Sequence, residues 1–211
     1  DLGETWNDLS GFNLNVSGKS SNGFPDVAVY SLLVMPHNSN IIWAGTDDGN
    51  IQVTKNGGKC WKNVIGNVFG VPKNTWVYHI EASVHDENTA YVVFDGHTSG
   101  DMKAYAYKTN DLGKNWTNII PNDDVIGFTR NIQEDYENPN LLFLGTELGL
   151  YITINGGDRW SKFTKNVPPV AVHYIELQAN TNDLVMGTHG RGVIIIDDIS
   201  PLREINETNL S

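Results

Sequence analysis

The 211-residue chain has a single cysteine, Cys60, and no spacing of cysteine and histidine that matches a structural zinc site. Lysine and arginine number 14 against 25 aspartates and glutamates, which gives a formal net charge of −11. The apolar runs are strand-sized and far shorter than a transmembrane helix needs. These shortages exclude an internal disulfide and argue against membrane insertion and against nucleic acid as a partner. We therefore expect a packed globular protein without a metal or a cofactor.

Several catalytic and phosphate-binding motifs are also missing. Gly187, Gly190 and Gly192 are spaced differently from a dinucleotide-binding loop, and a strand rather than a helix is expected after them. The sequence has no Gly-x-Ser-x-Gly elbow, no His-Glu-x-x-His and no Cys-x-x-Cys. The six histidines are scattered at positions 37, 79, 85, 97, 173 and 189. Taken singly, such histidines are more typical of packed or solvated side chains than of ligands.

The sequence has instead a repeat of the form Thr-x-(Asp/Asn)-x-Gly-x-x-Trp, with three full copies and a truncated copy at its start. The tryptophans of the four copies are spaced like the blades of a β-propeller rather than like helical-pair repeats. The positions that define the repeat are Asp1, Gly3 and Trp6; Thr54, Asn56, Gly58 and Trp61; Thr109, Asp111, Gly113 and Trp116; and Thr153, Asn155, Gly157 and Trp160.

Between these repeats the chain reads as short strands separated by turns rich in glycine, asparagine and aspartate. The predicted strands cover residues 30–36, 41–45, 51–55 and 61–65; 76–84, 90–95, 103–108 and 115–120; 127–133, 141–145, 150–154 and 159–164; and 172–178, 183–187 and 193–197. The sequence thus predicts an all-β fold, a β-propeller of four-stranded antiparallel blades, of which about four are visible and the last lacks its fourth strand.

Each part of the repeat has a structural role. The glycine supplies a positive φ in the hairpin between the third and fourth strands, and the asparagine or aspartate accepts backbone N–H bonds. The tryptophan is expected to be largely buried between adjacent sheets. A calcium loop is the competing interpretation, but Asn56 and Asn155 remove charge where that ion needs it. We therefore interpret the repeats as folding elements and not as metal or catalytic sites.

These repeats resemble the Asp-box, or bacterial neuraminidase repeat (BNR), propellers, which include sialidases, xyloglucan-cleaving glycoside hydrolases and sortilin-type receptors. Residues 186–203 resemble the closing blade of large sortilin-like or "glycosyl hydrolase"-labelled bacterial proteins, in which the propeller continues into another domain. The resemblance implies a secreted or cell-surface location. It also implies a ligand face built from the turns between second and third strands and from the loops that lead into each first strand.

We interpret residues 1–200 as propeller blades and residues 201–211 as a linker toward a further domain. Two ring sizes remain open. A strand after Trp6 could complete a four-bladed ring, or the chain is the C-terminal part of a six- to eight-bladed ring whose remaining blades are its partners. Because the first residue falls inside a repeat, we favour the larger ring. The turn after residue 197 lacks the glycine and tryptophan of a repeat, so we expect a strand from the N-terminal side of the ring to pair with residues 193–197.

The variable polar residues of the ligand-face turns are the candidates for binding, because scaffold turns commonly carry specificity. We expect this face to be negative, with His189 and Arg191 as its basic spot. The candidates are Asp47, Asp48, Asp95, His97, Asp101, Glu147, His189 and Arg191.

Two functions fit this sequence. The first is a non-catalytic module of a larger secreted or surface protein that binds a protein or a carbohydrate or serves as a scaffold. The second is part of a glycoside hydrolase, xyloglucanase-like or sialidase-like, which needs two carboxyl groups about 5–10 Å apart. The four arginines, Arg130, Arg159, Arg191 and Arg203, cannot by themselves assemble the three-arginine clamp of a sialidase, and further blades would have to contribute to it. We favour the first function, and two carboxyls facing each other in a cleft beside Trp76 or Tyr174 would favour the second.

Overall fold

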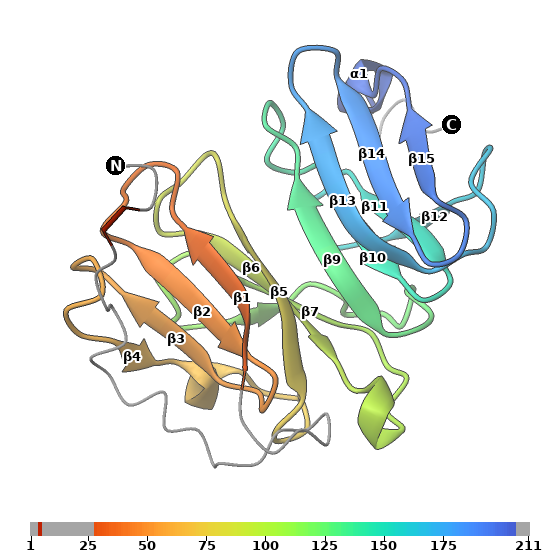
Figure 1. The fold of residues 1–211 in the computed structure, drawn as a ribbon. Coiled ribbons are helices and arrows are strands. Elements are labelled where there is room, and N and C mark those ends of the chain that lie inside the picture. Colours follow the sequence, from red (N-terminus) through yellow and green to blue (C-terminus); the bar gives the residue numbers. More distant parts are fainter. Residues whose placement is uncertain (1–3, 6–27, 206–211) are drawn as a thin grey trace.

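The computed structural model describes residues 4–5 and 28–205, and this part of the chain forms four antiparallel sheets with their strands in chain order. Three sheets have four strands and the last has three. Figure 1 shows the sheets following one another as blades, with the first strands β1, β5, β9 and β13 lying side by side. This arrangement confirms the predicted all-β propeller fold. The truncated repeat at Asp1, Gly3 and Trp6 lies outside the described residues, as does any strand that follows it.

The strand bounds are as follows. The first blade comprises β1 (Val29–Val34), β2 (Ile42–Thr46), β3 (Ile51–Thr54) and β4 (Lys62–Asn63). The second comprises β5 (Trp76–Ala82), β6 (Ala90–Asp95), β7 (Tyr105–Thr109) and β8 (Thr117–Asn118). The third comprises β9 (Thr129–Glu134), β10 (Leu142–Thr146), β11 (Gly149–Thr153) and β12 (Ser161–Phe163). The fourth comprises β13 (Val172–Gln178), β14 (Asp183–Thr188) and β15 (Val193–Ile196).

The outermost strands β4, β8 and β12 are shorter than the sequence predicts, with only two or three residues each. The chain must leave the outer edge of each blade and return to the centre to begin the next first strand. After β4 this return starts with the 3-10 turn η1 (Ile65–Asn67). The outer hairpin therefore ends early, although every predicted strand is present.

Apolar layers between successive blades form the core. A cluster around Trp43, Ile51 and Phe94 joins the first two blades, and separate clusters join the second to the third and the third to the fourth. Close approach of the blades depends on two glycines in second strands. A Cβ on Gly45 would lie 2.5 Å from a methyl group of Val77, and one on Gly145 would lie 2.6 Å from the Val172 carbonyl oxygen. Small residues at these positions allow the next first strand to pack.

The repeated turns share one hydrogen-bond pattern. In the second blade, the Thr109 hydroxyl donates to Asp111 at 2.9 Å and accepts the Gly113 N–H at 2.9 Å. The Asp111 carboxylate also accepts the Asn115 N–H at 2.9 Å. The equivalent bonds recur in the other two described copies, from Thr54 and from Thr153. All three repeat glycines have a positive φ, as this turn requires.

The repeat tryptophans differ in burial. Trp160 is 6% exposed and its indole N–H donates to the Ile119 carbonyl in the preceding blade at 2.6 Å. Trp61 and Trp116 are only half-buried, which corrects the expectation that all three are largely buried. Trp116 packs edge-on against Trp43, with ring centroids 5.9 Å apart. The burial of the repeat tryptophan therefore varies from blade to blade.

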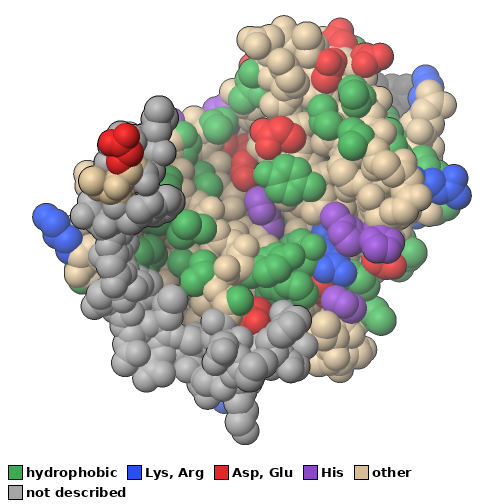
Figure 2. Space-filling model, viewed as in Figure 1, with side chains coloured by type: hydrophobic (Ala, Val, Ile, Leu, Met, Phe, Trp, Pro, Cys, Tyr) green, Lys and Arg blue, Asp and Glu red, His purple; other side chains and the backbone are tan. Residues whose placement is uncertain are grey.

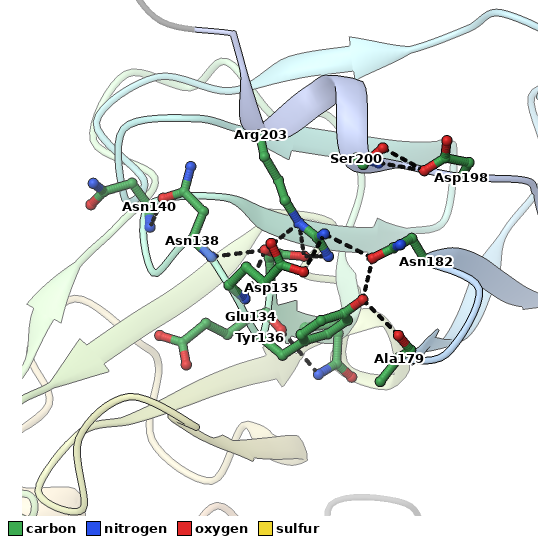
Figure 3. Close-up of polar contacts among 12 residues, drawn as sticks. Glu134, Asp135, Tyr136, Asn138, Asn140, Ala179, Asn182, Asp198, Ser200 and Arg203 are labelled. Atoms are coloured by element: carbon green, nitrogen blue, oxygen red, sulfur yellow. Dashed lines mark hydrogen bonds and ion pairs between the residues drawn. The ribbon is translucent and has the colours of Figure 1, made fainter.

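After β15 the chain folds back instead of leaving the blade. Residues Ser200–Arg203 form the short helix α1, and Ile199, just before it, is 1% exposed in the core between the third and fourth blades. Figure 3 shows the guanidinium of Arg203 between Asp135 and Asn182, above the ring of Tyr136. The first residues of the predicted linker are therefore part of the last blade, while residues 206–211 lie outside the described range.

None of the helices among the described residues is long enough and apolar enough to cross a membrane.

Candidate ligand-binding site

The residues proposed for the ligand face all lie where the second strand of a blade passes into the third. Their places are the β2–β3 turn for Asp47 and Asp48, the end of β6 for Asp95, the 3-10 turn η2 (His97–Ser99) for His97, the chain before β7 for Asp101, the β10–β11 turn for Glu147 and the β14–β15 turn for His189 and Arg191.

Three of these carboxylates are engaged in hydrogen bonds with nearby groups. Asp48 is 1% exposed and accepts the Thr46 hydroxyl at 2.6 Å. Asp101 accepts the Tyr105 hydroxyl at 2.8 Å. Asp47 is 2% exposed and accepts the N–H of Ala28, just before β1, at 3.0 Å. Asp48 and Asp101 therefore support their own turns, while Asp47 holds the entry to β1 and also lines a cavity.

A β-bulge at the same place in every first strand brings a further set of residues together. In each blade the pairing register slips by one residue opposite the end of the second strand. The extra residues are Tyr30, Tyr78, Arg130 and His173. A bulge re-aims a side chain and is frequent beside functional sites. All four bulge residues line one cavity of about 540 Å³, and we call the cavity and these residues the bulge site.

The first two blades supply the aromatic half of the bulge site. Tyr30 lies 4.4 Å from the ring of Trp76 and 5.0 Å from that of Tyr78, measured between centroids. Tyr30 is 47% exposed, so one face of this aromatic group is open to a ligand. Partial burial and a hydrogen bond with Tyr78 raise the pKa of Tyr30 to about 12, which keeps its hydroxyl neutral. Across the cavity, Tyr174 exposes 56% of its surface.

The third blade supplies a basic group, Arg130, that is almost completely buried. Its Nη1 lies 2.7 Å from the fully buried carboxylate of Asp95, and its guanidinium lies between the rings of Tyr78 and Phe128. His97 donates its backbone N–H to the same carboxylate and stacks on Phe128. Of the proposed residues, Asp95 thus holds Arg130 in place, and His97 in turn holds Asp95.

The fourth blade adds two stacked histidines. The rings of His173 and His189 lie 5.3 Å apart, at an interplanar angle of 29°. Burial, the positive charge of Arg130 and the adjacent His189 lower the pKa of His173, while Glu147 and Asp95 oppose this effect. His189 itself is exposed. Figure 2 shows histidines and a basic side chain gathered beside an apolar patch on this face.

Three buried polar atoms of residues that line the bulge-site cavity have no hydrogen-bond partner. These atoms are Nε2 of His79, Nε of Arg130, which is a donor, and Oδ1 of Asn131, which is an acceptor. Arg130 and Asn131 are 8% and 1% exposed. A second cavity of about 520 Å³ shares Tyr30 and Arg130 with the first and extends to Asp47, Trp76 and His97. Since buried polar atoms are normally paired, this arrangement is suited to a ligand with both donors and acceptors.

Glu81 is the carboxyl that lines the bulge-site cavity. Its Oε1 accepts the Gln133 amide N–H at 2.7 Å, and its Oε2 lies 3.4 Å from His79. Burial raises the pKa of Glu81, and the adjacent His79 partly opposes this effect. Glu176, on β13, is close enough to interact with Glu81 electrostatically but does not line this cavity. The cavity therefore has one carboxyl in its wall and not the facing pair that a glycosidase needs.

Sequence reasoning considered Trp76 and Tyr174 as flanking aromatics but missed the roles of Tyr30, Tyr78 and Arg130. A bulge shifts the alternation of side chains by one residue, but within strands of only six or seven residues this shift is hard to distinguish from irregular patterning. The sequence did carry one signal for the site, because Arg130 is a charged residue inside a predicted strand. A charge buried in a strand needs a partner of opposite charge. Among the described residues, no group of three or more histidine, cysteine or acidic side chains is placed to bind a metal.

No family model matches this chain. Over 130 residues, or 58% of its length, the chain is 26% identical to the oligoxyloglucan-reducing end-specific xyloglucanase of Emericella nidulans. It spans only 15% of that relative's length.

Solved structures match a larger part of this chain. The GH74 xyloglucanase from Xanthomonas campestris aligns with a TM-score of 0.64 at 13% identity, covering 81% of this chain and 29% of the xyloglucanase. YCF48 from Cyanidioschyzon merolae aligns with a TM-score of 0.58 at 15% identity, covering 81% of this chain and 53% of YCF48. YCF48 bound to D1 peptide aligns as well, with a TM-score of 0.55. At these identities the likeness shows the fold, and the chain is a β-propeller.

Proposed function

We propose that this chain is a non-catalytic ligand-binding part of a larger β-propeller and that it binds a glycan at the bulge site. The observation that carries the proposal is the repeated bulge, which directs one residue from each of four blades into a single cavity. Each bulge leaves one residue outside the ladder and re-aims its side chain, as bulges beside functional sites commonly do. A shared binding function accounts for all four.

The chemistry of the cavity favours a carbohydrate over a peptide. Sugar rings have apolar C–H faces that pack on aromatic rings, and Tyr30 and Tyr174 offer exposed rings. Sugar hydroxyls both donate and accept, and the unpartnered atoms of Arg130 and Asn131 are one donor and one acceptor. The partial similarity to a xyloglucanase agrees with this choice. The alternative, a peptide ligand, has its precedent in YCF48 bound to D1 peptide.

The proposal also covers the kind of repeat, the size of the ring and the location of the protein. We interpret the three described repeats as Asp boxes of the sortilin-like kind, on the basis of their shared threonine and aspartate or asparagine bonds. We also place the chain in a six- to eight-bladed ring of a secreted or cell-surface protein. Sequencing the complete gene tests both statements, because it must contain further Thr-x-(Asp/Asn)-x-Gly-x-x-Trp repeats and an export signal.

Isothermal titration calorimetry against neutral and acidic oligosaccharides tests the glycan site. Tyr30→Ala should weaken binding by about tenfold or more, because it removes the exposed ring that both cavities share. Phe69→Ala is the matched control, since Phe69 is 79% exposed but lies outside the bulge site. Loss of binding in Phe69→Ala with full binding in Tyr30→Ala would contradict the proposal.

One observation supports the second candidate, a glycoside hydrolase. Burial raises the pKa of Glu81, as a general acid requires, and Tyr174 lines the same cavity. Release of reducing ends from xyloglucan by the wild-type chain, abolished in Glu81→Gln, would establish this function. Binding without hydrolysis would support the non-catalytic module.

A further inference from the structure

The two halves of the bulge site differ in charge. The first and second blades place tyrosines at the bulge, while the third and fourth place Arg130 and His173 there. His97 lies beside Arg130 through Asp95, and His189 stacks on His173. In a chain with a net charge of −11, this is a local gathering of basic and titratable groups. We call His97, His173 and His189 the histidine rim.

We infer that the bulge site takes an acidic glycan, whose carboxylate binds against Arg130 and the histidine rim while its ring packs on Tyr30. We further infer that this binding strengthens as His173 takes up a proton. The inference rests on the proposed function, because it names the ligand class for the same cavity.

The charges around the rim explain the dependence on protons. His173 faces Arg130 from β9, Glu147 from the β10–β11 turn, His189 from the β14–β15 turn and Asp95 from β6. With neutral imidazoles, Asp95 and Glu147 oppose the positive charge of Arg130, and Asp47 lines the adjoining cavity. A proton on His173 adds a positive charge beside the cavity, and because burial and Arg130 lower the pKa of His173, that proton is taken up below the ordinary value of 6.5.

The remaining titratable groups of the cavity lie on its other side. His79 and Glu81 are neighbours on β5, 3.4 Å apart, and Glu176 projects from β13 beyond Tyr174. Lower pH protonates Glu81 before an exposed carboxyl, because burial raises its pKa. Acidification therefore weakens the repulsion of a ligand carboxylate by Glu81 while it strengthens attraction by the rim. Both effects favour an acidic ligand at low pH.

A short galacturonate oligomer and its methyl ester form a matched pair of probes, since they differ only in the charge of the carboxyl groups and in the small methyl group that replaces it. Calorimetry on the full chain should show the acid binding about tenfold or more tightly at about pH 5.5 than at about pH 7.5. The ester should bind with little change between the two. The double variant His173→Gln/His189→Gln should lose the pH effect for the acid. His37→Gln, which alters an exposed histidine outside the cavity, should keep it.

The outcomes separate this inference from the proposed function. If acid and ester bind equally at both pH values and Tyr30→Ala abolishes both, the glycan site stands and the acidic-ligand inference is overturned. If the pH effect survives in His173→Gln/His189→Gln, the rim is not its source and the inference is again overturned. If neither probe binds, nor any neutral oligosaccharide, both proposals fail.

Discussion

Arg203 in α1 forms a two-point ion pair with Asp135, just after β9: its Nη2 lies 2.9 Å from one carboxylate oxygen and its Nε 2.9 Å from the other. The pair links residues 68 positions apart, and the side chain of Asp135 is fully buried. Figure 3 shows that the same guanidinium also reaches Asn182 in the last blade. The end of the described chain is therefore fixed to two blades at once.

Arg203→Ala should lower the free energy of unfolding by about 3–5 kcal/mol, because it leaves the buried charge of Asp135 without its partner. Urea denaturation followed by circular dichroism measures this loss. Adding Asp135→Asn to Arg203→Ala should restore part of it by removing the buried charge. Arg159→Ala, at an exposed position, should change stability by less than about 0.5 kcal/mol. If Arg203→Ala lowered the free energy of unfolding no more than Arg159→Ala does, the ion pair would not contribute to stability.

Trp160 has the best-packed ring of the three described repeats, so Trp160→Ala should cost about 3–5 kcal/mol. Trp160→Phe keeps most of the apolar contact but loses the bond to the Ile119 carbonyl, at a cost of about 1–3 kcal/mol. Trp116→Ala should cost less than Trp160→Ala, since Trp116 is only half-buried. Thermal melting ranks the three variants, and a reversed order would refute the burial argument.

Gly145→Ala should destabilise the chain by about 1–3 kcal/mol, because the new methyl group would meet the Val172 backbone oxygen and separate two blades. Gly66→Ala provides the control, since a Cβ there meets no atom within 4 Å and the backbone is not left-handed. Equal stability of the two variants would mean that the blades are not closely packed at Gly145.

Glu81→Gln tests the raised pKa of this carboxyl. The folded chain holds the Glu81 proton more tightly than the unfolded chain does, so the stabilisation is fully present below the ordinary pKa of 4.5 and is lost as the pH rises through the folded value. The variant cannot lose this proton, so it should melt higher than the wild type at neutral pH. A gain of about 1 kcal/mol corresponds to about 2–4 °C for a chain of this size.

The difference between the two melting curves should shrink as the pH falls toward 4.5, where the wild-type side chain is also neutral. Glu87→Gln, at an exposed position between β5 and β6 and not among the groups that shift the Glu81 pKa, is the matched control. A constant difference at all pH values would show that burial does not perturb Glu81.

The repeat motif and the spacing of strands and turns were enough to predict the blades, because hairpins follow from local turn chemistry and from the alternation of side chains. The packing role of Arg203 was not predictable, since it depends on contact with Asp135, a distant residue. The bulge site was also hidden. Its four central residues become equivalent only when the register of each first strand is known, and Tyr30 and Arg130 share no motif.

The central claim is that the bulge site binds a glycan, and nitrogen-15 NMR of the full chain tests it most directly. Titration with the galacturonate oligomer at about pH 5.5 should shift the side-chain N–H signals of Trp76 and Arg130, which line the cavities. The indole N–H signal of Trp160 should not move, because this group is buried, bonds the Ile119 carbonyl and lies outside both cavities. Unchanged Trp76 and Arg130 signals in the presence of bound oligomer would contradict the claim.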